Sequence, residues 1–550
     1  MKSILTLLPL AVFLVPCAGA DLPSRTGYLN TPCLEWSIEW QGTTGNPHDV
    51  IASVEFTGPD RVRFRTPMFY GGNDQWRFRF TGTRAGTWKL RTDGPGDLGG
   101  HTATVEILER PGGKANGFMT HFGSKWGWRG TQEAFVPQYV MGKNLGAYYD
   151  HDAGCVNEAK IEQDIQEFVV EHGFTGFHLQ GRGRWFSLTG RPAKDPNPDP
   201  RTYEVLETII RKVYEQGGAC HIWMWGKDTG RDGDGPRAMV GGPMTAADRR
   251  NLRYLAARLG PIPGWSIGYG YDTENLWASL GELEAWKEYL HTHCGWHHFV
   301  GARVGFDEKG LYGEFGKGIP KPPLNDKYNA PVGDAYTAWL GGDYIGYTSY
   351  RPLYDRYVEV LEHRADKPSF EEDRFRLREA PQWTHKDYTP ELTIRGLWHS
   401  AMAGGVANIW GNLLPGDNRG GSQSYNHGDV HIKSRIKTYA TFFRDRRRFH
   451  RDLVRDNTLA DPYEGTTETP YAPPISACLR APEYDRFIFY KEQATAVGMD
   501  LSHMKGPAPA IAVDTRQVYR EIDLGLLTRT KQKWIAPHCS DWAIAVGRFE

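Results

Sequence analysis

Lys367-Pro-Ser-Phe-Glu-Glu-Asp373 and Trp265-Ser-Ile-Gly-Tyr-Gly-Tyr-Asp-Thr-Glu-Asn275 are two short apolar runs that end in carboxylates. A helix-like segment precedes each of them. In a (β/α)8 barrel the carboxyl ends of all strands meet at one face, where such barrels carry out their chemistry. If both runs are strands of one barrel, we expect their carboxylates to come together at its mouth.

The surrounding sequence alternates between strand-like and helix-like segments. Helical stripes of apolar residues separate apolar runs at 135–140, 176–180, 219–225, 265–269, 299–304, 344–348, 368–371 and 406–410. Eight such units in about 250 residues or more are typical of a (β/α)8 barrel. A doubly wound open sheet is the alternative, but no Gly-rich phosphate loop follows an early strand. The sequence therefore favours a TIM barrel of the α/β class.

Both flanks of this region have the texture of β-sheet. Short alternating runs such as Trp36-Ser-Ile-Glu-Trp40 and Trp76-Arg-Phe-Arg-Phe80 predict antiparallel strands with one solvated face, hence a β-sandwich. Alternation returns in the tail, as in Arg486-Phe-Ile-Phe-Tyr490. The predicted division is a signal peptide at 1–20, an N-terminal β-sandwich at 21–115, the barrel at 116–457 and a small C-terminal β-sandwich domain at 458–550.

Composition limits the function classes. A chain of 550 residues is too long for one core, and a formal charge of −1 gives no reason to expect a nucleic-acid partner. The 19 Trp, 27 Tyr and 24 Phe suit stacking on sugar rings, although large cores also need aromatic residues. No Cys-x-x-Cys or His-Glu-x-x-His pattern occurs, so neither a metal nor a cofactor is expected. The oligomeric state is left open.

The amino terminus predicts export. Met1-Lys2, the apolar run Ile4–Val15 and Ala18-Gly-Ala20 form a cleavable signal-peptide pattern, which places the protein outside the cell or in the periplasm. No other run approaches the length of a membrane span. In an oxidising compartment Cys478 and Cys539 could pair.

Strand parity selects candidate catalytic residues, since alternate residues face the lumen. We expect Phe370 to face the helices, which leaves Glu371 inward as the first candidate nucleophile and Glu372 as the second. With Ile267 outward, Asp272 and Glu274 share the inward parity, and either could be the acid/base. A carboxylate after a strand can instead cap the next helix.

The same parity predicts polar and aromatic groups that suit sugar hydroxyls and ring faces. The expected lumen residues are His178, Gln180, Arg182, His221, Trp223 and Trp225. Tyr350 and Trp410 could flank the scissile sugar, and Arg374 could hold a uronate or sulfate. For the two histidines, the alternative interpretation is a core side chain with no role in binding.

Two facing carboxylates are what glycosidic bond cleavage needs. The predicted function is therefore a glycoside hydrolase acting on a plant or algal polysaccharide or its oligosaccharides. One alternative is a barrel that binds glycans without catalysis. Another is a polysaccharide lyase, in which His178 would be the base beside Arg182.

Two resemblances extend this interpretation. Trp36-Ser-Ile-Glu-Trp40, Phe69-Tyr-Gly-Gly72, Trp76-Arg-Phe-Arg-Phe80 and Gly86-Thr-Trp88 resemble an uncharacterised β-sandwich module found ahead of secreted glycoside-hydrolase barrels. The barrel resembles the retaining (β/α)8 superfamily that includes the apiosidase-like enzymes. That resemblance implies an acid/base Glu after an Asn on the fourth strand and a nucleophile Glu on the seventh. Here Asn275 follows Glu274, so the acid/base stays open between Asp272 and Glu274. A Trp on the eighth strand would correspond to Trp410.

Overall fold

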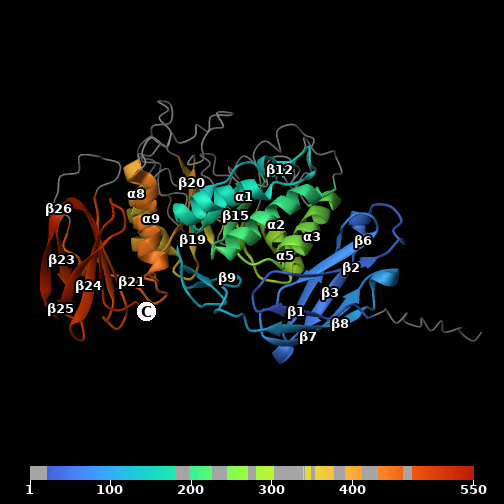
Figure 1. The fold of residues 1–550 in the computed structure, drawn as a ribbon, viewed down its shortest axis with the longest axis horizontal. Coiled ribbons are helices and arrows are strands. Elements are labelled where there is room, and N and C mark those ends of the chain that lie inside the picture. The colour runs from blue at the N-terminus through green and yellow to red at the C-terminus, as the bar shows by residue number, and fades with distance from the viewer. Residues whose placement is uncertain are drawn as a thin grey trace, which may run out of the picture.

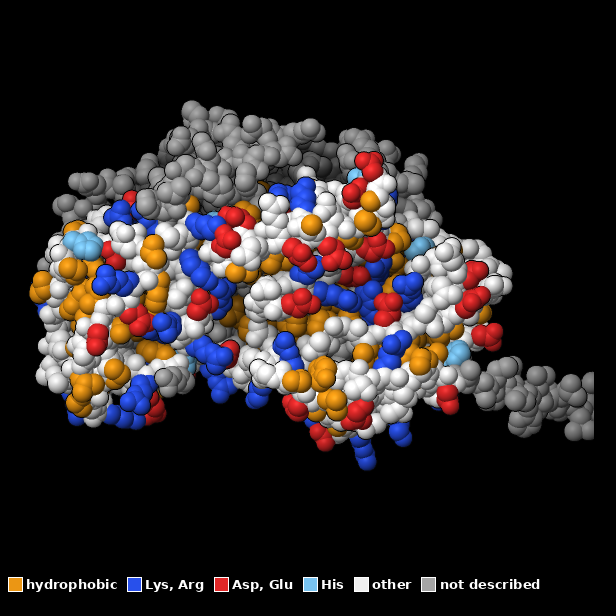
Figure 2. Space-filling view, viewed as in Figure 1, with side chains coloured by type: hydrophobic (Ala, Val, Ile, Leu, Met, Phe, Trp, Pro, Cys, Tyr) orange, Lys and Arg blue, Asp and Glu red, His pale blue; other side chains and the backbone are white. Residues whose placement is uncertain are grey.

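A computed structural model describes residues 21–180, 188, 197–225, 244–270, 280–302, 339, 341–347, 354–376, 390–411, 431–462 and 474–549. A parallel barrel with surrounding helices forms the middle of the molecule, between N-terminal sheets and a C-terminal antiparallel sheet (Figure 1). The predicted fold class is confirmed. Lys and Arg side chains are interspersed with Asp and Glu over the described surface of the face in Figure 2, as the near-zero net charge suggests.

Two sheets precede the barrel, and their alternating sequences bury one face of each. One sheet has the order β1 (Arg25–Tyr28), β8 (Thr102–Leu108), β7 (Gly86–Asp93), β3 (Ser53–Thr57) and β4 (Arg63–Pro67). The other has the order β2 (Leu34–Glu39), β6 (Gln75–Phe80) and β5 (Phe69–Tyr70). Their shared core contains Trp36, Phe56, Phe78 and Trp88, all at most 1% exposed.

Eight parallel strands form the barrel. In chain order they are β11 (Gln138–Met141), β14 (Gly176–Gln180), β15 (Cys220–Trp225), β16 (Trp265–Gly270), β17 (Phe299–Gly301), β18 (Ile345–Tyr347), β19 (Ser369–Arg376) and β20 (Ala407–Gly411). The helices around them are α1 (Glu158–Ile165), α2 (Pro200–Glu215), α3 (Ala246–Leu259), α5 (Leu280–Cys294), α7 (Tyr354–His363), α8 (Pro390–Ala403) and α9 (His431–Ala440). Helix α3 begins with a capping box between Thr245 and Asp248, as its sequence predicts.

Neighbouring strands of the barrel pair in the order β17, β16, β15, β14, β11, β20, β19 and β18. In the described barrel β17 and β18 are therefore the two end strands. Asp343 lies across this seam. Its N–H donates to Val300 O at 2.8 Å, and its Oδ2 accepts the Val300 N–H at 2.9 Å. The barrel is therefore nearly closed. At the seam Asp343 makes one backbone and one side-chain hydrogen bond to Val300, in place of a strand ladder.

An antiparallel hairpin fills the amino-terminal end of the barrel. It consists of β9 (Met119–Phe122) and β10 (Lys125–Trp128). Trp126 is fully buried, packs against Phe299, Tyr344 and Phe370, and donates from Nε1 to Ser369 O at 3.0 Å. Because aromatic rings occupy this end, the opposite end is the one available to a substrate.

A buried ionic network joins the N-terminal sheets to the barrel helices. Glu207 of α2 contacts Arg79 of β6 at 2.7 Å and Arg258 of α3 through both carboxylate oxygens, at 2.5 and 2.9 Å. Burial alone would raise the pKa of Glu207, but Arg258 and Arg79 outweigh it and lower that pKa to about 2. The carboxylate is therefore charged at neutral pH, and the network fixes one domain against the next.

A six-stranded sheet completes the described chain. Its order is β21 (Val454–Arg455), β22 (Ser476–Arg480), β23 (Phe487–Asp500), β26 (Lys531–Val546), β24 (Ala508–Asp514) and β25 (Glu521–Leu527). It packs on α8, where Trp398 stacks on Tyr490 and Arg395 holds both oxygens of Asp541. Helix α8 thus lies between the C-terminal sheet and the barrel (Figure 1).

The cysteines at positions 33 to 539 are free thiols. The suggested Cys478–Cys539 pair is therefore not formed: Cys478 is buried in the sheet core and Cys539 is exposed. Cys220 is a buried free thiol, as expected, and burial raises its pKa to about 12. Within the described residues no helix is both long and apolar enough to cross a bilayer.

Candidate active site

The seventh strand, β19, places Phe370 in the lumen. Its ring lies 4.6 Å from that of His221 and 5.7 Å from that of Tyr139, on the third and first strands. The prediction that Phe370 faces the helices is therefore wrong. The physical reason is the aromatic layer built on Trp126, which makes the lumen at this height an apolar site for a large ring.

The same strand carries Glu372 into the lumen. Glu371 pairs with Asn408 of β20, and the next paired residue is Arg374 with Ile409, so Glu372 and Asp373 lie at an irregularity of the ladder. Bulges of this kind re-aim side chains and are common beside active sites. Glu372 is 0% exposed and lies within β19, two residues beyond Phe370 toward the carboxyl end of the strand.

Side chains of the third strand hold the Glu372 carboxylate. Trp223 Nε1 donates to Glu372 Oε2 at 2.6 Å, and His221 Nε2 lies 3.7 Å from the same oxygen. Oε1 has no hydrogen-bond partner among the described residues. One carboxylate oxygen is thus fixed by an N–H donor, and the other is buried in the lumen.

Two glycines provide the space that the carboxylate occupies. A Cβ at Gly268 of β16 would lie 3.1 Å from Glu372 Oε2, and a Cβ at Gly346 of β18 would collide with Oε1. Glycine at these positions lets the fourth and sixth strands approach Glu372 closely. Gly268 also confirms the inward parity predicted for this part of β16.

Two histidines pack beside Trp223. His178 lies edge-to-face with Trp223 at 4.2 Å and stacks on His221 at 5.5 Å. Burial lowers the pKa of His221, and the nearby Glu372 only partly opposes this, so its imidazole is neutral at neutral pH. His221 Nδ1 lies 2.9 Å from Ser266 Oγ, so a tautomer protonated at Nε2 turns its N–H toward Glu372. The lumen positions predicted for His178, His221 and Trp223 agree with this packing.

Glu371, the first candidate nucleophile, lies on the other side of β19. Burial and the Glu371 charge together raise the pKa values of Tyr347 and Tyr357 well above the usual range. Both phenols belong to the core between the barrel and its helices, and Tyr357 also donates to Asn408 at 2.7 Å. The predicted inward orientation of Glu371 is therefore wrong, because Phe370 and not Glu371 has the lumen parity.

Trp410 also faces outward. It is fully buried in the layer between strands and helices, and its Nε1 donates to Gln138 Oε1 at 2.7 Å. The lumen positions of β20 belong to Ala407 and Ile409. The predicted stacking of Trp410 on the scissile sugar is therefore wrong.

The remaining predicted residues fall into three groups. Asp272, Glu274, Arg182 and Tyr350 lie outside the described residues. For Trp225 and Arg374 the structure describes only the backbone, which pairs with Gly270 and Ile409. Gln180 is half-buried and pairs with Trp223, two residues beyond His178 and at the same parity.

Sequence reasoning missed several residues that shape the site. Tyr139 and Tyr344 line the aromatic layer beneath Glu372. Burial, with the Glu372 charge, raises the pKa of Tyr344 well above its usual range, so the phenol keeps its proton. A sequence signal existed for the glycines: Gly268 and Gly346 each interrupt an apolar run at an inward position, which often marks close approach of a neighbouring group.

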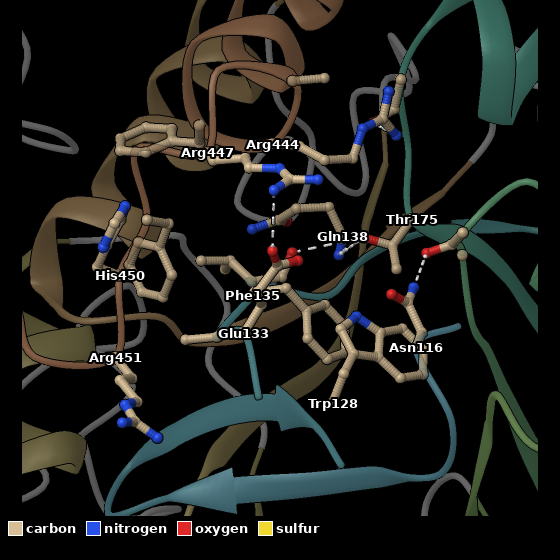
Figure 3. A pocket seen from close by; sticks show the side chains of 18 of the residues that line it. Asn116, Trp128, Glu133, Phe135, Gln138, Thr175, Arg444, Arg447, His450 and Arg451 are labelled. Atoms are coloured by element: carbon tan, nitrogen blue, oxygen red, sulfur yellow. Dashed lines mark hydrogen bonds and ion pairs between the residues drawn. The ribbon is translucent and has the colours of Figure 1, made fainter. Parts of the chain in front are cut away.

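A separate cavity of about 520 Å³ lies at the amino-terminal side of the barrel. Figure 3 shows Trp128, Phe135, Gln138 and Thr175 on one side, with Arg444, Arg447, His450 and Arg451 on the other. Arg447 pairs with Glu133 at 3.5 Å. Because the chemistry of such barrels occurs at the opposite end, we place the candidate active site at Glu372 and not in this cavity.

Comparisons with known proteins agree with this architecture. Residues 33–93 match the family described as "Domain of unknown function (DUF5060)". No curated protein matches the chain by sequence.

Solved structures match it by fold. A presumed glycoside hydrolase from Bacteroides vulgatus is similar over 96% of this chain and 100% of its own, with a TM-score of 0.66 and 12% identity. A glycoside hydrolase family 5 protein from the same organism is similar over 80% of this chain and 94% of its own, with a TM-score of 0.53 and 11% identity. At such identities the likeness shows the fold: a barrel like those of glycoside hydrolases, preceded by a DUF5060-like segment.

Proposed function

We propose that this protein is a secreted glycoside hydrolase that cleaves glycosidic bonds of a plant or algal polysaccharide or its oligosaccharides. The observation that carries the proposal is the position of Glu372. It is a buried carboxylate within the seventh strand, oriented by Trp223 and facing the lumen. The fold likeness to glycoside hydrolases supports the same class.

In the proposed mechanism Glu372 is the nucleophile. A retaining enzyme needs an ionised carboxylate about 5–5.5 Å from an acid/base carboxyl, and forms a glycosyl-enzyme intermediate. The Trp223 N–H holds the Glu372 carboxylate in place for attack on the sugar. When water later hydrolyses the intermediate, the same bond stabilises the carboxylate as it leaves the sugar.

Asp272 or Glu274 is the proposed acid/base. Gly268 faces Glu372 from the fourth strand, and both acidic residues follow it at the same parity in the sequence. The resemblance to the retaining superfamily that includes the apiosidase-like enzymes favours the same strand for this role. The acid must keep its proton near neutral pH, which a partly dry pocket provides by raising the pKa of the carboxyl group.

The side chains around Glu372 are suited to a site for an uncharged sugar ring. Trp223, His178 and His221 pack together beside Glu372 at the base of the lumen, and burial lowers the pKa of His221. Arg374 is the proposed contact for an acidic substituent, such as a uronate or a sulfate.

The proposal that the protein is exported rests on the signal-peptide pattern at 1–20. Amino-terminal sequencing of the protein purified from its native host tests whether this segment is cleaved.

The test is hydrolysis of a panel of aryl glycosides and plant and algal polysaccharides, with the first product followed by proton NMR. We expect release of reducing sugar with retained anomeric configuration. An inverted product would still identify the protein as a glycoside hydrolase, but Glu372 would then be the base that activates water. Glycan binding without hydrolysis on any substrate would contradict the proposal and favour the glycan-binding alternative.

A further inference from the structure

Three metal-ligating side chains converge at the seam of the barrel, away from Glu372. His291 is in the last turn of α5, His297 precedes β17 and Asp343 precedes β18. One ligand atom from each lies within 4.8 Å of the others, and no other such group of three occurs among the described residues. We propose that His291, His297 and Asp343 bind one divalent transition-metal ion, with Zn²⁺ as the best-fitting ion.

The donor set suits zinc. Two imidazole nitrogens and one carboxylate oxygen are common zinc ligands at about 2.0–2.2 Å, and water can take the fourth position of a tetrahedron. His291 Nε2 now lies 2.8 Å from Asp343 Oδ2. Two ligands of a tetrahedral ion are about 3.3 Å apart at these bond lengths, so the pair must separate by about half an ångström. His297 is exposed, which gives the ion a route from solvent and leaves room for the water.

The backbone already orients one ligand. Val300 N–H donates to Asp343 Oδ2 at 2.9 Å, and Asp343 N–H donates to Val300 O. Such outer hydrogen bonds fix a ligating carboxylate and strengthen metal sites. The Asp343 side chain therefore stays at the seam with or without an ion, and the two imidazoles have to adjust.

The location indicates a structural role. The three ligands join the end of α5, the start of β17 and the start of β18, where the described barrel has no strand ladder. An ion here would link the end of α5 to the starts of β17 and β18 across the seam. Because the ion binds the native site and not a preformed site in the unfolded chain, binding raises the melting temperature.

The experiment uses the full chain without an affinity tag, treated with EDTA and dialysed. Zinc chloride is titrated by calorimetry, and melting temperature is measured with and without zinc. The key variant is His297→Ala, which removes an exposed ligand and should leave the melting temperature of the metal-free protein unchanged. Asp343→Asn is the second variant, since an amide oxygen can still accept from Val300. His293→Ala is the matched control: His293 shares the last turn of α5 but stacks on Tyr289 at 4.1 Å.

We expect one zinc ion per chain, a zinc-dependent rise in melting temperature, and at least tenfold weaker binding in His297→Ala and Asp343→Asn. His293→Ala should bind like wild type. Equal affinity in all four proteins, or no saturable binding in wild type, would overturn the site. The result is independent of the proposed hydrolase activity, because neither readout involves a sugar.

Discussion

The indole Nε1 of Trp223 donates a 2.6 Å hydrogen bond to Oε2 of Glu372, linking the third strand to the seventh across the lumen. Both side chains are fully buried. A buried carboxylate is costly unless it is hydrogen-bonded, and this bond supplies a donor to Glu372 where it lies. The proposed chemistry depends on the position that this bond gives to the carboxylate.

Trp223→Phe tests the hydrogen bond directly. Phenylalanine keeps an aromatic ring against His178 but removes the N–H donor. Hydrogen bonds to charged groups contribute about 1.5–3 kcal/mol, so we expect kcat to fall about 10- to 100-fold. Unchanged kcat would mean that Trp223 does not support the reacting carboxylate.

Gly268→Ala tests the space around Glu372. The added Cβ would lie 2.9 Å from Trp223 Cδ1 and 3.1 Å from His221 Nε2 and Glu372 Oε2, so these side chains must shift. We expect activity to fall at least tenfold, since small displacements of reacting groups have large effects on rate. The control is Gly281→Ala in α5, where a Cβ meets nothing within 4 Å. Equal activity of the two variants would argue against a reacting group at this position.

Glu207→Gln tests the junction between the N-terminal sheets and the barrel. The substitution leaves Arg79 and Arg258 buried with one negative charge fewer between them. Breaking a buried ion pair from one side costs about 3–5 kcal/mol, and we expect that loss in the free energy of unfolding. Glu55→Gln is the control, because the Glu55–Arg63 pair is exposed and contributes little. Comparable destabilisation by both variants, measured by urea unfolding, would contradict the buried network.

The buried His298 predicts a pH dependence of stability. Burial against Trp265 and Phe118 lowers its pKa to about 3, whereas the unfolded chain has a histidine pKa near 6.5. Between these values the unfolded state binds the extra proton, so stability falls as the pH drops from about 6.5 toward 3.

His298→Gln removes this titration and can still donate to Gly260 O, which His298 Nε2 contacts at 2.7 Å. The slope of the unfolding free energy between pH 6 and 4 should become shallower by about 1.4 kcal/mol per pH unit. Urea unfolding at several pH values measures it. Parallel curves for the variant and wild type would show that His298 is protonated in the native state.

The barrel was predictable because its periodicity is regular. On β14 and β15 the residues Phe177, Leu179, Ile222 and Met224 pack in the layer next to the helices, so parity placed His178, His221 and Trp223 in the lumen. These strands obey the general rule that branched and aliphatic side chains fill the layer between strands and helices. Local sequence therefore carried enough information for them.

Strand β19 did not follow this rule. Phe370 faces inward because Trp126, distant in the sequence, builds an aromatic layer inside the barrel. The irregularity after Glu371 adds a second change that no local pattern marks. Trp410 faces outward for a related reason, since its partner Gln138 lies on another strand. Such features depend on contacts between remote segments, and strand parity alone does not contain them.

The central claim is that Glu372, and not its neighbour Glu371, is the reacting carboxylate. The most direct measurement compares kcat for Glu372→Gln and Glu371→Gln on one hydrolysed substrate, with melting temperatures recorded for both. We predict that Glu372→Gln loses activity by at least a thousandfold while keeping its fold, whereas Glu371→Gln retains catalysis in its folded fraction. Full activity in Glu372→Gln, or selective loss of kcat in a stably folded Glu371→Gln, would contradict the account.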